Sequence, residues 1–317
     1  MKHEALTGER PGKIHHEIPG AQLPNREGFT TYNACDTTPL FLIGAEGLSY
    51  IDDVLYSNFI EKYKGNVERA VEHILESVDE QDALYWDTTP AESNAYTLRV
   101  TYWKDSILPH SEGKEEPHYP VSFAQAHFMA ARGLLAASRI LDDPELGAMA
   151  DKMFVKGIQQ FITPEAFIVY KDSDGQLAQS SSDELHSLAY IPTEYADILP
   201  LDAIKKRAEE LATPFGYICT PPNVSQSLTD TYHGDKIWVF EQALIHYGSN
   251  RFGLEQEAAT ASAISSMIGR GQELYGIEYD ATGLATLRPE GNDQQLWSVA
   301  AEQYFTEQSN LARVYWL

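Results

Sequence analysis

One aspartate stands among side chains that suit a proton donor. Asp105 lies in the segment Thr-Tyr-Trp-Lys-Asp-Ser at residues 101–106. Neighbouring aromatic rings can exclude water from a carboxyl group, which raises its pKa toward the range where it can deliver a proton. Lys104 would oppose that rise if its ammonium group pointed inward. The structural alternative is a loop or helix-capping aspartate whose oxygens accept backbone N–H groups.

Glu273 is a second acid in an unusual setting. We expect it at the C-terminal end of a helix, just before Leu-Tyr-Gly at 274–276. The helix dipole disfavours an anion there. The structural alternative is an exposed glutamate of the last helical turn. Glu278 is close enough in sequence to be an alternative candidate to Glu273.

The strong acidity of the chain limits the partners it can have. Its 47 acidic and 23 basic residues give a formal net charge of −24. This charge would repel a phosphate backbone, so it argues against nucleic-acid binding and against anionic membranes, and it favours a neutral substrate. Most of these acids simply keep the surface soluble.

Composition also bears on cofactors and on the compartment. The two cysteines, Cys35 and Cys219, are far apart without metal-type spacing, which predicts packing roles and neither a disulfide nor a zinc site. No glycine-rich nucleotide fingerprint is visible, so we expect no cofactor and no metal. The start of the chain lacks the apolar segment of a signal peptide, and no apolar stretch reaches membrane-spanning length, so the expected compartment is the cytoplasm.

Helical periodicity dominates the chain after a polar arm predicted over residues 1–30. Amphipathic or apolar helical patterns pair into hairpins, with about ten helices in about five hairpins. The helical patterns cover 66–78, 120–141, 143–162, 183–199, 200–212, 236–248 and 253–274. Only 167–172 and 215–220 have extended character, and no alternation is long enough to predict a sheet. We therefore predict an all-α fold with one domain over 31–317.

Long loops separate the predicted hairpins. They cover 83–119, 163–183 and 214–235, and they are rich in Trp, Tyr, Asp and Pro. Long loops in a compact domain are usually functional or disordered, and aromatic residues argue against disorder. These loops are therefore where we expect a site.

Five separated phrases resemble, in order, those of bacterial amylo-α-1,6-glucosidases and glycogen-debranching-like glycoside hydrolases. The phrases are TGERPGKIHHEIPG (7–20), TYNACDTTPLFLIG (31–44), TYWKDS (101–106), DTYHGDKIWVFEQALIHYGSNRFG (230–253) and QEL (272–274) with QLWSVAA (295–301). Each phrase alone is weak, but five in order over most of the chain are specific.

That resemblance implies an (α/α)6 toroid of helical hairpins and an inverting α-glycosidase. It implies Asp105 as the general acid and Glu273 as the general base, with Glu278 as the alternative base. The family usually carries an earlier hairpin, so we expect an incomplete or shortened barrel, open or closed by a partner chain, of unknown oligomeric state. The sequence departs from the family pattern at Val239 and Gln272, where the family usually has proline.

Several side chains are expected to bind the sugar. Asp36 can hydrogen-bond a hydroxyl or cap its helix, or do both. At another helix start, His233 can donate to a hydroxyl, and the indole of Trp238 can form a platform for a pyranose ring. A lone histidine in a turn is more often structural. The complete predicted set is Asp36, Trp86, Trp103, Lys104, Tyr232, His233, Trp238 and Gln295.

The tryptophans support this placement independently of the resemblance. Four of the five lie in or next to the segments that hold the candidate acids: Trp86, Trp103, Trp238 and Trp297. We interpret Trp297 as a core residue, with Gln295 as the more plausible wall residue.

Three functions follow from these observations. The first is an α-glucoside hydrolase that acts on oligosaccharides or on glucosyl or mannosyl conjugates. The second is a catalytically silent carbohydrate-binding or regulatory module on the same fold. The third is a helical-toroid sugar epimerase or unsaturated-uronide hydrolase, since a fold does not fix a chemistry. An epimerase would use histidines, and His233 and His246 are the candidates.

Overall fold

The computed structural model describes residues 9–16, 34–88, 100–105, 117–226, 231–267, 269 and 271–308. Most of the arm predicted over 1–30, and much of the loop predicted over 83–119, lie outside these residues. The chain divides into two compact units. The first contains the residues up to Phe161 together with Ile168–Leu177, and the second contains Ile162–Phe167 and the residues from Ala178 onward.

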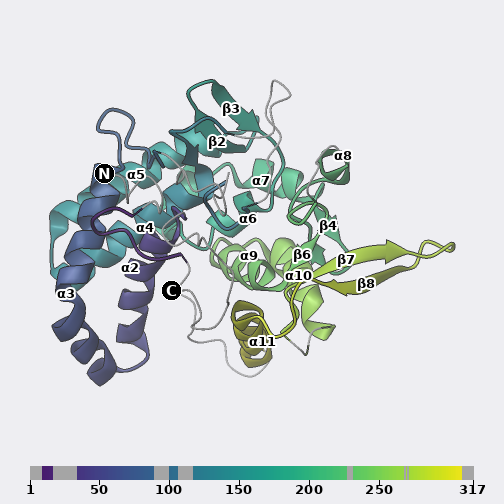
Figure 1. Cartoon of the computed structure of the whole chain (residues 1–317). Helices are drawn as coiled ribbons and strands as arrows, with labels where there is room; N and C mark the ends of the chain where they lie inside the picture. The colour runs from purple at the N-terminus through teal and green to yellow at the C-terminus, as the bar shows by residue number, and fades with distance from the viewer. Residues whose placement is uncertain are drawn as a thin grey trace, which may run out of the picture. The chain divides into compact units, whose positions relative to one another are not determined.

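The first unit is built on two helical hairpins (Figure 1). Its helices are α2 (Thr37–Gly47), α3 (Asp53–Glu76), α4 (Ala124–Leu141) and α5 (Pro144–Phe161), and the short 3-10 helix η1 (Leu48–Tyr50) joins α2 to α3. Helix α4 packs against both α2 and α5. It is buried around most of its circumference, as its apolar sequence predicts.

Helix α3 is longer than the helix predicted over 66–78, and its first residues show why. Asp52 caps the helix, because its carboxylate accepts the N–H groups of Val54 at 2.8 Å and Leu55 at 2.9 Å. The helix therefore begins at Asp53, thirteen residues before residue 66, where the predicted helix begins. The stripe itself is buried as expected.

A buried ion-pair group joins α2 to α4. Glu46 is 3% exposed, and its two carboxylate oxygens accept hydrogen bonds from Arg132 and Arg139, each at 2.5 Å. Charged hydrogen bonds of this kind are stronger than neutral ones. They fix α2, the helix that begins directly after Asp36.

The second unit is organised around α9. Its helices are α6 (Asp183–Ser187), α7 (Leu201–Ala208), α8 (Pro222–Ser225), α9 (Val239–Arg251), α10 (Glu255–Ser262) and α11 (Leu296–Gln308), with 3-10 helices η2 (Thr193–Ile198) and η3 (Ala263–Ser266). Helix α9 packs against α6, α10 and α11. Gly248 allows the contact with the segment after α6, because a Cβ there would lie 2.7 Å from the backbone nitrogen of Ala189.

Three small antiparallel sheets complete the described residues. They are β1 (Ser122–Phe123), β2 (Ile168–Asp172) and β3 (Gly175–Ala178); β4 (Ala212–Thr213) and β5 (Gly216–Tyr217); and β6 (Ile237–Trp238), β7 (Leu274–Tyr279) and β8 (Ala285–Glu290). The extended segment predicted at 167–172 is confirmed by β2, whereas only Gly216–Tyr217 of the segment predicted at 215–220 form a strand. The prediction of no sheet is wrong, most clearly at the β7–β8 hairpin, which extends away from the helices of its unit (Figure 1).

Two predicted helices end early. The helix predicted over 253–274 stops at Ser262, continues briefly as η3 and gives way to Gly271, whose φ of +65° is left-handed. The helix predicted over 183–199 divides into α6 and η2 around Pro192, which has no N–H group to continue a helix. Glu273 consequently precedes a strand and does not end a helix.

The described residues contain ten α-helices. None of the helices in this part of the chain combines the length and apolar character that crossing a bilayer requires.

Candidate active site

Asp36 is a buried acid of the first unit with a strongly raised pKa. It is 5% exposed and occupies the N-cap position of α2, but its side chain makes no capping hydrogen bond. Its carboxyl group instead accepts a backbone N–H from Trp103. Burial raises the pKa of Asp36 to about 7, and the nearby charge of Asp105 adds to the rise. The predicted capping role is wrong, whereas a ligand role stays a prediction.

Asp105 belongs to the same group but has a different environment. Its side chain is exposed, so the prediction that neighbouring aromatic rings exclude water from it is wrong. The physical reason is the orientation of its neighbours. Tyr102 is buried and stacks on Phe123 with ring centroids 4.6 Å apart, while Asp105 faces solvent. An exposed carboxyl group beside a buried one remains available to a substrate.

Lys104 is enclosed by the protein. It is 1% exposed, and its ammonium nitrogen lies 5.0 Å from the centroid of the Trp103 ring. A cation at this distance from an indole is attracted by the negative face of the ring. Lys104 therefore supports Trp103, which is half-buried beside Asp105.

Buried hydrogen bonds hold the segments of Asp36 and Asp105 together. Cys35 donates its N–H to the carbonyl of Thr101 at 2.7 Å, and Tyr85 donates its hydroxyl to the carbonyl of Cys35 at 2.9 Å. The hydroxyl of Thr101 donates to Asp87 at 2.6 Å. Sequence reasoning missed Thr101 and Asp87, although Asp87 directly follows a tryptophan that it did select.

Trp86 faces away from this group. Tyr85 and Asp87 are buried, and each lies in an antiparallel bridge, Tyr85 to Val78 and Asp87 to Val121. Side chains of successive extended residues point to opposite faces, so Trp86 points away from its two neighbours. It is half-buried and lines a separate hollow.

Glu273 is one of the buried acids of the second unit. It is 3% exposed, so the alternative of an ordinary exposed glutamate is wrong. Asn292 donates its backbone N–H to one carboxylate oxygen at 2.7 Å and its side-chain amide to the same oxygen at 3.0 Å. Gln295 donates to the other oxygen at 3.4 Å. These amides orient the carboxylate.

The turn around Glu273 depends on two further residues. Gly291 has a φ of +73°, and a Cβ there would lie 2.4 Å from a carboxylate oxygen of Glu273, so this position requires glycine. Gln272, which stands where the related family usually has proline, donates its amide to the carbonyl of Glu290 at 2.6 Å. The substitution therefore gains a hydrogen bond to the turn that holds Glu273.

Aromatic rings gather beside Glu273, because β6 pairs with β7 and places Trp238 opposite Leu274. His233 stacks on Trp238 with centroids 4.6 Å apart and planes at 12°. His233 is 4% and Trp238 2% exposed, so the face of Trp238 is not open to a sugar. The expected platform role of Trp238 is therefore not supported by its burial.

The open rings of this cluster are Tyr232 and Trp297. Tyr232 is 38% exposed and Trp297 is 44% exposed, so the interpretation of Trp297 as core is wrong. Trp297 stacks on Phe240 with centroids 5.0 Å apart. It follows Gln295, the amide partner of Glu273, by two residues. An exposed indole beside an oriented carboxylate is an arrangement that suits a sugar ring.

The alternative site residues lie elsewhere in the second unit. Glu278 is exposed on β7 and pairs with Arg288 at 3.1 Å, which makes it a poorer candidate than Glu273 for an enclosed base. His246 contacts the hydroxyl of Tyr304 at 2.8 Å, and burial lowers its pKa. His233 lies in the cluster of Trp238. The two histidines considered for an epimerase therefore contact different groups of aromatic residues.

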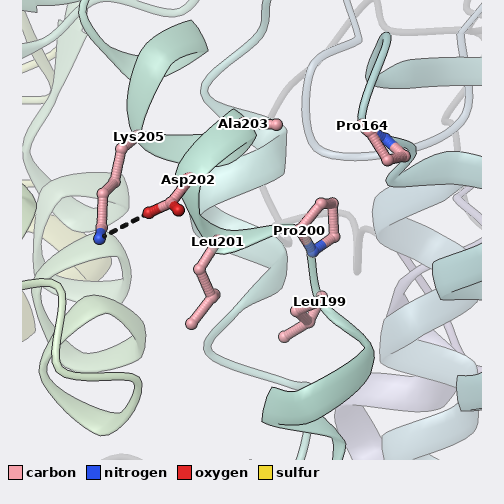
Figure 2. Close-up of a pocket in the computed structure, with 7 residues that line it drawn as sticks. All are labelled: Pro164, Leu199, Pro200, Leu201, Asp202, Ala203 and Lys205. Atoms are coloured by element: carbon pink, nitrogen blue, oxygen red, sulfur yellow. Dashed lines mark hydrogen bonds and ion pairs between the residues drawn. The ribbon is translucent and has the colours of Figure 1, made fainter.

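The hollow in Figure 2 does not provide another centre. Within the described ranges, no group of three or more His, Cys, Asp or Glu side chains is arranged to hold a metal ion. The hollow in Figure 2 lies at the start of α7, and its two charged side chains, Asp202 and Lys205, pair with each other at 3.2 Å. None of the predicted site residues lines it.

Comparisons with known proteins identify the fold. No known protein family matches the sequence, and no curated protein matches it. Among solved structures, an uncharacterized conserved protein from Thermus thermophilus superposes with a TM-score of 0.63 and 14% identity over 96% of this chain and 85% of that one. A GH63 mannosylglycerate hydrolase from the same organism, in complex with glucose, gives 0.62 and 16% over 96% and 85%. A D-mannose isomerase gives 0.51 and 10% over 89% and 74%.

These likenesses show the fold of the chain. It has the helical-toroid fold of the six-hairpin, glycosidase-like proteins, which confirms the predicted all-α fold class. The fold alone hosts both a hydrolase and an isomerase, so the chemistry has to be argued from the side chains.

Proposed function

We propose that this chain is an inverting glycoside hydrolase that acts on α-linked glucosides or on related oligosaccharides and conjugates. The observation that carries the proposal is Glu273, a buried carboxylate held by the amides of Asn292 and Gln295 beside the exposed ring of Trp297. The resemblance of the Asp105 and Glu273 segments to amylo-α-1,6-glucosidases, and the glycosidase-like fold, support it.

In the proposed reaction Asp105 and Glu273 take the roles of acid and base that the family resemblance implies. Asp105 donates its proton to the glycosidic oxygen as the bond from that oxygen to the anomeric carbon breaks. Glu273 takes a proton from a water molecule, whose oxygen attacks the anomeric carbon from the opposite face. The released sugar has inverted configuration, and the proton on Glu273 returns to solvent. Asn292 and Gln295 fix the direction in which Glu273 accepts that proton.

The other predicted residues divide between binding and support in this proposal. Asp36 bonds a sugar hydroxyl, because a carboxyl group with a pKa near neutrality can donate as well as accept. Tyr232 and Trp103 present partly open rings, and buried Lys104 steadies Trp103. His233 and Trp238 are the buried members of the aromatic cluster beside Glu273.

The test is release of reducing sugar from a panel of α-linked oligosaccharides and of glucosyl and mannosyl conjugates. The purified chain is compared with its Asp105→Asn and Glu273→Gln variants. Turnover that is lost in both variants supports the hydrolase and both roles. Sugar binding by calorimetry without any turnover would instead favour the silent binding module, and interconversion of free sugars would favour the epimerase.

Trp297→Ala should raise KM by roughly tenfold with a smaller change in kcat, because the substitution removes an exposed platform worth about 1 kcal/mol or slightly more. Leu296→Ala is the matched control, since Leu296 is 82% exposed on the same turn of α11. Steady-state kinetics on one accepted substrate measure both variants. Equal KM values in the two variants would contradict the platform role.

A further inference from the structure

The first unit contains a hollow that does not belong to the Asp36 group. It has a volume of about 670 Å³, within the range of small-molecule sites. Its wall comes from the end of α3 and the turn after it, from Trp86 and Thr88, from Pro120, and from the turn at Asp172 and Ser173. Trp86 is the aromatic residue of this wall.

The frame around Trp86 is rigid. Its backbone N–H donates to the carbonyl of Ser77 at 2.7 Å, and bridges lie on both sides of it. Asp79 accepts the N–H groups of Gln81 at 2.8 Å and Asp82 at 3.1 Å, which closes the turn after α3. The backbone that carries the indole is therefore fixed before any ligand arrives, which lowers the entropy cost of binding.

The opposite wall is equally well fixed. Asp172 is 8% exposed, and one of its oxygens accepts the N–H of His118 at 2.8 Å. The other oxygen accepts the N–H groups of Asp174 at 2.9 Å and Gly175 at 3.0 Å. Because its oxygens already accept these N–H groups, Asp172 contributes to the shape of the hollow. The contacts with a ligand are expected from other residues.

Polar groups with unused bonding capacity surround the indole. The side chains of Glu76, Glu80 and Gln81 are exposed at the rim and make no hydrogen bond within the described residues. The hydroxyl of Thr88 also has no partner in that part of the chain. An apolar ring face with nearby carboxylate and amide groups matches a pyranose, which has an apolar face and a rim of hydroxyls.

The charge of the lining residues limits the class of ligand that this hollow can bind. The hollow is lined by acidic side chains and by no Lys or Arg among the described residues. Its negative potential would repel a phosphorylated sugar or a uronate and leave a neutral sugar unaffected. We infer that this hollow is a second carbohydrate site, which holds a neutral glycosyl unit of an oligosaccharide against Trp86, apart from the proposed Asp105 acid.

The inference is tested by calorimetry with a linear α-1,4-linked glucose heptamer. The protein is the full chain carrying Asp105→Asn and Glu273→Gln, so that the sugar is not consumed. Adding Trp86→Ala should weaken binding to this site roughly tenfold, the factor that corresponds to about 1.4 kcal/mol. Tyr63→Ala is the matched control, because Tyr63 is a 36% exposed aromatic residue on α3 outside the hollow. Gln81→Ala should also weaken binding, and glucuronate should not compete.

This result is separable from the proposed hydrolysis. Trp86→Ala in the otherwise native chain should leave kcat/KM on a short aryl α-glucoside unchanged. Unaltered heptamer binding in both Trp86→Ala and Gln81→Ala would overturn the second site. A parallel loss of short-substrate turnover and heptamer binding would also overturn it, because Trp86 would then belong to the catalytic subsite. If the native chain hydrolyses nothing, the calorimetric comparison still decides the inference.

Discussion

Glu273→Gln should lower kcat for α-glycoside hydrolysis by about 10²–10⁴-fold, the range that positioned proton transfer contributes. The amide keeps the shape of the carboxylate and can still accept from Asn292, but it cannot take a proton from water. The loss should be the same for every leaving group, because the activation of water does not depend on the group that departs. Steady-state kinetics on natural linkages and on aryl glycosides measure it.

The acidity of the leaving group distinguishes the role of the general acid, Asp105, from that of the general base, Glu273. An acidic phenol departs with little help from a proton donor, so Asp105→Asn should lose much less activity on aryl glycosides than on oligosaccharides. Glu278→Gln is the control for Glu273, since Glu278 is exposed and paired with Arg288. A large loss in Glu278→Gln with an active Glu273→Gln would transfer the role of base to Glu278.

Asp36→Asn should increase the free energy of unfolding at pH 8 by up to about 4 kcal/mol, the linkage equivalent of a pKa near 7 against an ordinary value of 3.8. Burial disfavours the carboxylate, so the folded chain holds this proton to higher pH than the unfolded chain does. Between about pH 4 and 7, deprotonation of the unfolded chain lowers the stability, and the loss persists above pH 7. Asparagine removes the cost and can still accept the Trp103 N–H.

Urea unfolding across pH 4–8, followed by circular dichroism, measures this effect. At pH 4 the native chain and the Asp36→Asn variant should have similar stability, and the difference should grow with pH. Asp197→Asn is the control, because it changes the same charge at an exposed position of the chain. A native chain that gains stability over this window relative to Asp36→Asn would contradict the buried, proton-holding Asp36.

Periodicity was sufficient to predict the helices that carry the fold. The stripe of Val67, Ala70, Val71 and Ile74 lies inside α3, and the apolar run after residue 120 forms the buried α4. These segments bury one face or most of their surface, and their sequence records that directly.

The surroundings of the acids could not be predicted, because they depend on contacts between distant segments. Asn292 and Gln295 reach Glu273 only because β8 folds back on β7. Of the two carboxyl groups Asp36 and Asp105, Asp36 is the desolvated one, since the chain turns Tyr102 inward and leaves Asp105 in water. A local sequence pattern does not specify which of these two carboxyl groups becomes buried.

The most direct measurement of the central claim is the anomeric configuration of the first sugar released from an α-linked substrate. Proton NMR during the first minutes of turnover distinguishes the two anomers before they equilibrate. We expect the β-anomer to appear first, as inversion by one acid and one base requires. First appearance of the α-anomer would contradict the account, because retention requires a carboxylate that attacks the sugar itself.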